Sequence, residues 1–278
     1  MSRRYLPIRW PSSPSCSSSN LSWCNRLNTH QIAGVGARLK VNIEEKAFRT
    51  SNGATIEVLR DLRFEVGQGE FACILGPSGC GKTTTLRVLL GLDREYQGSV
   101  QLPGLSEASI GAVFQEPMLL PWRTVEQNVR LAMPKHLREA NLDGLFSTLG
   151  LSKMRNFYPG ELSLGLARRA AIARALAIEP DILLLDEPFV SLDEPTAQQL
   201  RHMLLSVWSE RPTTALMVTH NLQEAIMLAD RIIVLSDRPA HVIGTFDIRL
   251  PRNYRNEQVK SDLLRSFNTR FAGPGGVP

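Results

Sequence analysis

Runs of apolar residues along the chain predict the strands of an α/β protein. Residues 39–43 and 56–59 alternate between apolar and polar side chains, the pattern of strands with one buried face. Residues 182–186 are predicted to form a strand that is apolar up to Asp186, and residues 214–219 repeat this pattern, which is typical of strands covered on both faces in a parallel sheet. Shorter runs predict the remaining strands, at residues 63–66, 71–75, 110–114, 232–235 and 241–245.

Helices are predicted between these strands and near the C-terminal end. Residues 84–90 are helix-forming and directly follow a glycine-rich turn, and residues 125–180 read as a mainly helical insertion. Residues 254–271 place apolar side chains at helical spacing, with basic residues between them. A helix on a membrane surface would share this pattern, but we expect the segment to cover its own domain.

Changes in composition divide the chain into successive parts. Residues 1–37 are rich in Ser, Pro and Asn, so they predict either a disordered tail or a reading frame that starts too far upstream. Residues 38–250 are expected to form one domain without an internal repeat, with a helical part at about residues 116–180. Residues 251–278 are expected to add a C-terminal helix and tail.

Composition and charge narrow the class of protein. The net charge of +5 comes from scattered basic residues, which indicates a solvated surface rather than a nucleic-acid site. No apolar stretch is long enough to span a bilayer, and Arg3-Arg4 is not followed by the apolar segment of a signal peptide. The four cysteines form neither a CxxC pair nor a zinc-site spacing, which fits a reducing cytoplasm. Any membrane function is therefore expected to depend on a partner.

Residues 76–83 read Gly-Pro-Ser-Gly-Cys-Gly-Lys-Thr, a complete phosphate-binding loop between a predicted strand and a predicted helix. Glycines let the main chain aim its N–H groups at one anion, where the helix dipole adds positive potential. Lys82 is expected to reach the β- and γ-phosphates and Thr83 to coordinate Mg²⁺. The predicted nucleotide-binding residues here are Gly76, Pro77, Ser78, Gly79, Cys80, Gly81, Lys82, Thr83 and Thr84.

Cys80 lies inside this loop and beside the start of the helix. That position is expected to lower the pKa of its thiol, so that an alkylating reagent would block ATP binding and ATP would protect. The alternative is that any small residue fits there without a redox function.

Asp186 ends the strand predicted at residues 182–186, and Glu187 follows it. A carboxylate at the end of a buried strand beside a phosphate-binding loop is suited to the Mg²⁺ shell, which we assign to Asp186. Glu187 is expected to act as the general base for the attacking water. The alternative is that both acids cap the next helix.

With these motifs in order, residues 39–250 resemble the ATP-binding subunit of an ABC transporter. The resemblance implies a P-loop NTPase with a RecA-like core, an antiparallel β subdomain and a helical subdomain. It also implies that Gln115 senses Mg²⁺ and the attacking water, that Asp193 belongs to the loop called the D-loop, and that His220 contacts the γ-phosphate. Phe48 falls where the family places an aromatic ring against adenine, with a packed core aromatic as the alternative.

The family's Leu-Ser-Gly-Gly-Gln signature is altered here to Leu162-Ser-Leu-Gly-Leu166. The resemblance implies that Ser163 and Gly165 meet the γ-phosphate held by a second copy, so that two ATP molecules are sandwiched in a homodimer. Leu164 and Leu166 replace a glycine and a glutamine, and a working but slower dimer is expected.

The segment Val113–Val129 resembles importers of the nitrate, sulfonate and taurine group, as do residues 236–240. This resemblance implies an ATPase at the cytoplasmic face of the membrane that powers a separate permease, supplied by a solute-binding protein. Residues 118–122 would then form an apolar docking surface, or else pack within the helical insertion. The other classes considered are a soluble ABC ATPase outside transport and a nucleotide-binding scaffold with impaired hydrolysis.

Overall fold

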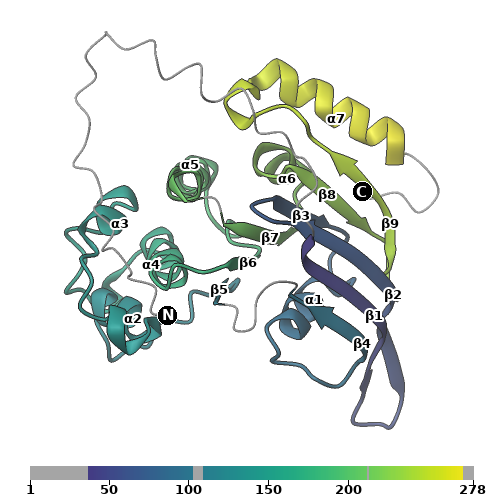
Figure 1. The fold of residues 1–278 in the computed structure, drawn as a ribbon, viewed down its shortest axis with the longest axis horizontal. Coiled ribbons are helices and arrows are strands. Elements are labelled where there is room, and N and C mark those ends of the chain that lie inside the picture. The colour runs from purple at the N-terminus through teal and green to yellow at the C-terminus, as the bar shows by residue number, and fades with distance from the viewer. Residues whose placement is uncertain (1–36, 103–108, 212, 272–278) are drawn as a thin grey trace, which may run out of the picture.

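The computed structural model of this chain describes residues 37–102, 109–211 and 213–271. Within these residues the chain forms two sheets surrounded by helices (Figure 1). The tail predicted at residues 1–37 lies outside the described residues except for its last position, and so do residues 272–278 of the predicted C-terminal tail.

The larger sheet has six strands in the order β5-β6-β7-β3-β8-β9. Neighbouring strands run parallel except β8 and β9, which are antiparallel. The strands β3, β6 and β7 are buried along their whole length, which explains their apolar sequences. The strands are β3 (Phe71–Leu75), β5 (Ile110–Val113), β6 (Ile182–Asp186), β7 (Thr214–Thr219), β8 (Arg231–Leu235) and β9 (Val242–Asp247).

The smaller sheet is antiparallel and contains β1 (Ala37–Arg49), β2 (Thr55–Gly67) and β4 (Gln97–Gln101), with β1 in the middle. The separate strands predicted at residues 56–59 and 63–66 are one strand, so that prediction was wrong. Pairing with β1 continues in unchanged register on both sides of Asp61, although this residue adopts a φ of +47°.

The strand β4 was not predicted, because its sequence is mainly polar and lacks an apolar period. Near its start, β4 approaches β1 closely at Gly98, which has a φ of +125°. An ideal Cβ at this position would lie 2.1 Å from the carbonyl oxygen of Asn42, so only glycine permits this close pairing.

The larger sheet separates two apolar cores. Side chains from one face of the sheet pack with β1, β2 and α1 (Lys82–Leu89), and those from the other face pack with helices α2 to α7. Figure 1 shows α4, α5 and α6 together on the side of the sheet away from α1. The remaining helices are α2 (Val125–Ala132), α3 (Asp143–Thr148), α4 (Leu164–Leu176), α5 (Glu194–Glu210), α6 (Leu222–Leu228) and α7 (Glu257–Phe271).

The C-terminal helix α7 covers its own domain, as predicted. Phe267 is 2% exposed and its ring lies 5.4 Å from that of Phe246 on β9. Arg255 is one of the basic residues of segment 254–271, but it is buried. It donates hydrogen bonds to carbonyls at the end of α6, including Ile226 and Ala229 at 2.8 Å. Burial lowers the pKa of its guanidinium to about 10.

None of the helices in the described ranges is long and apolar enough to cross a membrane. The parallel strands place their carboxyl ends at one edge of the larger sheet. Leu75 is opposite Thr219, and Asp186 is opposite Val218. The phosphate-binding loop, the Asp186-Glu187 pair and His220 therefore leave the sheet side by side.

Candidate functional site

The phosphate-binding loop runs from the end of β3 into α1 and is shaped by its glycines. Gly79 and Gly81 have φ values of +78° and +122°, in the region that favours glycine. A Cβ on Gly81 would lie 2.7 Å from Cδ2 of Leu59 and 2.9 Å from Cγ1 of Val58. The loop thus packs against β2 at Gly81, where the contact leaves no space for a side chain.

Lys82 is the first residue of α1 and is 5% exposed. Its ammonium donates to the carbonyl oxygens of Gly76 at 2.9 Å and Pro77 at 2.8 Å, and lies 3.8 Å from Oε1 of Glu187. A buried ammonium held mainly by neutral carbonyls is a strong attractor for an anion, since a charge out of water needs opposite charge nearby. This arrangement fits a phosphate group.

Thr83 and Asp186 form the next part of the site. The hydroxyl of Thr83 donates to Oδ1 of Asp186 at 3.2 Å, across the gap between α1 and the end of β6. Burial raises the pKa of the Asp186 carboxyl, while the hydrogen bond from Thr83 and the charge of Lys82 lower it. A hydroxyl and a carboxylate are the kind of oxygen ligands that Mg²⁺ prefers, so the residues present, with Asp186 only 4% exposed, fit this ion.

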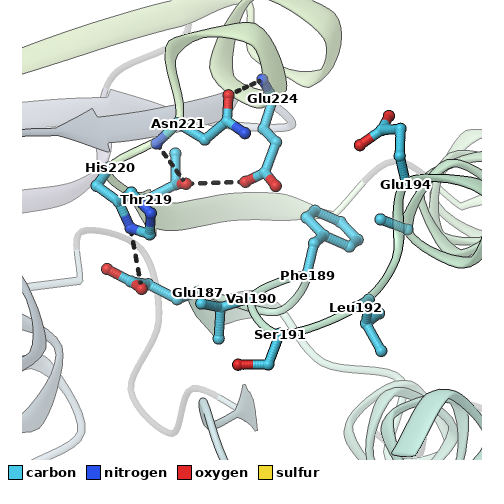
Figure 2. Close-up of a pocket in the computed structure, with 11 residues that line it drawn as sticks. Glu187, Phe189, Val190, Ser191, Leu192, Glu194, Thr219, His220, Asn221 and Glu224 are labelled. Atoms are coloured by element: carbon cyan, nitrogen blue, oxygen red, sulfur yellow. Dashed lines mark hydrogen bonds and ion pairs between the residues drawn. The ribbon is translucent and has the colours of Figure 1, made fainter.

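Glu187 and His220 meet at the ends of β6 and β7 (Figure 2). Nδ1 of His220 lies 3.1 Å from Oε2 of Glu187. Glu187 adopts a φ of +43°, unusual for a residue with a side chain, and its N–H donates to the carbonyl of Val218 at 3.0 Å. This backbone turn directs its carboxylate toward both Lys82 and His220.

These two side chains form one wall of a cavity of about 200 Å³. Figure 2 shows Glu187, His220 and Thr219 on one side of it and the turn from Phe189 to Leu192 on another. Its remaining lining includes Asn221, Glu194 and Glu224.

Two arginines of α4 hold main-chain carbonyls beside the site, and sequence patterns did not predict them. Arg168 on α4 is 4% exposed and donates to the main-chain carbonyls of Glu187 at 3.3 Å, Pro188 at 2.9 Å and Val190. Arg174, near the end of the same helix, donates to the carbonyls of Pro117 at 2.9 Å and Met118 at 2.6 Å. Their sequence signal is limited to their place among the three arginines of an otherwise apolar helix.

The contacts of the other predicted residues are with groups outside the phosphate-binding loop. Ser163 and Asp193 cap α4 and α5 by accepting from the N–H groups of Leu166 at 3.3 Å and Thr196 at 3.2 Å. Gly165 packs against α5, where a Cβ would lie 2.9 Å from Cγ2 of Thr196.

Phe48 is 42% exposed on β1, with the ammonium of Lys46 4.4 Å from its ring centre, and Gln115 is exposed after β5. In the described part of the chain, no hydrogen bond or ion pair links the loop with the side chains of these outlying residues: Phe48, Gln115, Ser163 and Asp193.

The prediction that the pKa of Cys80 is lowered was wrong. The side chain is 2% exposed and burial raises its pKa, although the charge of Lys82 lowers it in part. The effect of the helix start on the pKa is therefore smaller than the effect of removing the thiol from water. Met118 and Trp122, by contrast, are 61% and 68% exposed, as a docking surface requires.

The chain is similar in sequence to ABC transporter proteins. The family model for ABC transporters matches residues 59–190. Aliphatic sulfonates import ATP-binding protein SsuB 2 of Burkholderia cenocepacia (strain HI2424) is 40% identical over 235 residues, which cover 80% of this chain and 87% of the relative. Aliphatic sulfonates import ATP-binding protein SsuB of Bacillus subtilis (strain 168) is 41% identical over 254 residues, which cover 85% of this chain and 98% of the relative.

Among solved structures, the dimeric post-hydrolysis state of the ATP-binding cassette MJ0796, bound to ADP and Pi, is similar to this chain with a TM-score of 0.65. It is 29% identical, and the similarity covers 77% of this chain and all of that one.

Proposed function

Because this chain belongs to the ABC transporter family, we propose which function each site residue has in ATP binding and hydrolysis. The chain is the ATP-binding and ATP-hydrolysing subunit of an ABC importer. The observation that carries the proposal is the convergence of Lys82, Glu187 and His220, with separations of 3.8 Å and 3.1 Å, beside Thr83 and Asp186.

The phosphate-binding loop holds the triphosphate. Its main-chain N–H groups and the ammonium of Lys82 bind the β- and γ-phosphates, and this exchanges the two carbonyl partners of Lys82 for anionic oxygens. The exposed ring of Phe48 stacks on adenine, which its 42% exposure permits.

Thr83 and Asp186 hold Mg²⁺, with Gln115 joining them when the site closes. When bound, Mg²⁺ neutralises charge that develops on the phosphate oxygens during transfer. Without the ion, the hydrogen bond of 3.2 Å between Thr83 and Asp186 keeps their two oxygens next to each other.

Glu187 is the general base for the attacking water. Its carboxylate accepts the proton of the water, and its contacts with His220 and Lys82 hold it in place. His220 orients this carboxylate and reaches the γ-phosphate, and its half-exposed ring has room to do so.

A second copy of the chain completes the site. Ser163 and Gly165, at the start of α4, contribute a hydroxyl and a main-chain N–H to the γ-phosphate of the partner copy, and Asp193 lies at that interface. Leu164 is 43% exposed, so its side chain is accommodated at the surface and not in the core.

The chain acts with membrane permease subunits, and we propose that it contacts them at the cytoplasmic face through the exposed side chains of Met118 and Trp122. The imported solute, delivered by a solute-binding protein, is proposed to be an aliphatic sulfonate, the substrate class in the names of its relatives.

The test is ATP hydrolysis by the purified chain with Mg²⁺, beside Glu187→Gln, with size-exclusion chromatography in ATP. We expect turnover by the wild type, and a loss of about 10²- to 10⁴-fold with accumulation of an ATP-bound dimer for the variant. Equal turnover by both proteins would overturn the assignment of Glu187. Uptake of ethanesulfonate against nitrate, in vesicles with the cognate permease, tests the substrate class.

A further inference from the structure

The turn that carries His220 is held by a buried carboxylate. Oγ1 of Thr219 donates to Oε2 of Glu224 on α6 at 2.8 Å and accepts from the N–H of Asn221 at 3.0 Å. Glu224 is 9% exposed, and Figure 2 shows its side chain extending from α6 toward Thr219. The residues on both sides of His220 are thus fixed through one hydroxyl.

Arg201 on α5 connects this carboxylate to Glu194 at the start of the same helix. Its guanidinium is 5% exposed, lies 3.8 Å from Oε1 of Glu224 and forms an ion pair with Glu194, the residue after Asp193. It also lies 5.7 Å from the ring centre of Phe189. We call Thr219, Glu224, Arg201 and Glu194 the Arg201 relay.

The relay forms a partition between two cavities. Glu194 and Glu224 line the cavity of about 200 Å³ that Glu187 and His220 also line. The same two residues and Arg201 line a neighbouring cavity of about 320 Å³ between α5, α6 and α7. The turn at His220 is attached to α6 by Glu224 and by Asn221, whose side chain accepts from the N–H groups of Gln223 and Glu224.

We propose that Arg201 and Glu224 are positioning residues for ATP hydrolysis, which act by holding His220 against Glu187 and by tying this turn to the start of α5. The inference rests on the functions proposed above for Glu187 and His220. The buried pair fixes the geometry, because Glu224 presents one oxygen to Thr219 and the other to Arg201.

The experiment compares steady-state ATP hydrolysis and thermal unfolding for Arg201→Met, Arg201→Lys and the double variant Arg201→Met with Glu224→Gln. The double variant removes both buried charges and retains an acceptor for Thr219, so it is the safeguard if Arg201→Met fails to fold. We expect kcat to fall about tenfold in the double variant with the KM for ATP within about twofold, because a small misplacement of a catalytic group affects the chemical step. Arg201→Lys should recover part of this loss.

The matched control is Arg211→Met, which removes an ion pair with Glu179 at the other end of α5. Its kcat should equal that of the wild type. Wild-type kcat in the folded double variant would overturn the proposal. Glu187→Gln and His220→Ala are measured alongside: if these retain turnover, the proposed site is wrong, whereas if only the double variant retains it, the relay alone is wrong.

Discussion

The imidazole of His220 lies 3.1 Å from the carboxylate of Glu187, although the two residues end different strands and are separated by helix α5. This contact exists because β6 and β7 are parallel neighbours whose carboxyl ends meet at one edge of the sheet. It brings a donor to the proposed general base before nucleotide is present.

Replacing His220 by alanine tests this contact. Without its donor, Glu187 is no longer oriented, and we expect kcat for ATP hydrolysis to fall about 100-fold, the usual magnitude for one lost electrostatic partner. Binding of a fluorescent ATP analogue should change little, since Lys82 and the loop remain. Substitution of His241, whose Nδ1 lies 3.0 Å from the hydroxyl of Ser236 and outside the cavity lined by His220, is the control. Equal turnover in His220→Ala and wild type would contradict the prediction.

Thr83→Val should weaken the use of Mg²⁺. The change removes the hydroxyl that lies 3.2 Å from Asp186 but keeps a similar shape. We expect the Mg²⁺ concentration for half-maximal hydrolysis to rise at least about tenfold, equivalent to roughly 1.4 kcal/mol. Thr83→Ser restores the hydroxyl and should restore the wild-type titration. An unchanged titration for Thr83→Val would remove Thr83 from the metal site.

Alkylation of Cys80 should be slow at neutral pH and accelerate as the pH rises. Burial raises the pKa of this thiol, so the protonated form is favoured in the folded protein and the reactive thiolate is gained only in alkaline solution. Iodoacetamide labelling, followed by mass spectrometry of the peptide containing Cys80, measures the rate, and ATP should slow it further. The fully buried Cys73 is an internal reference. Rapid labelling at pH 7 would show that the thiol is accessible.

Gly165→Ala should destabilise the contact between α4 and α5. The new Cβ would lie 2.9 Å from Cγ2 of Thr196, a short branched side chain that has little freedom to move. We expect a loss of about 1–3 kcal/mol in unfolding free energy, measured by chemical denaturation. The pair Gly165→Ala with Thr196→Ser removes the clashing methyl and should recover most of that loss; no recovery would assign the cost to something other than this contact.

Arg255→Met should lower stability without changing the chemistry of the site. The guanidinium donates to carbonyls at the end of α6, among them Ile226 and Ala229, and methionine leaves these buried acceptors without a partner. We expect a loss of about 2–4 kcal/mol in unfolding free energy. Arg265→Met is the matched control on α7, because that exposed arginine pairs only with Asp262 among the described residues. Equal stability of the two variants would refute the capping function of Arg255.

The sequence predicted what depends on local pattern. The strands at residues 71–75, 182–186 and 214–219 were predicted with the bounds they have, because burial on both faces leaves a continuous apolar run. Contacts between distant residues left no such pattern. Arg168 and Arg255 bind carbonyls about 20 or more positions away, and a buried arginine reads in sequence like an exposed one. The strand β4 depends on the fit of Gly98 to Asn42 and on no period of its own.

The hydrogen bonds from Arg174 to the carbonyls of Pro117 and Met118 attach the proposed docking segment to α4 through its main chain. Main-chain acceptors are present whatever side chain a residue carries. The surface side chains at positions 118 and 122 can therefore diverge to suit different permeases while the attachment to α4 persists. Replacement of these two side chains is thus expected to change the proposed permease contact without breaking the attachment to α4.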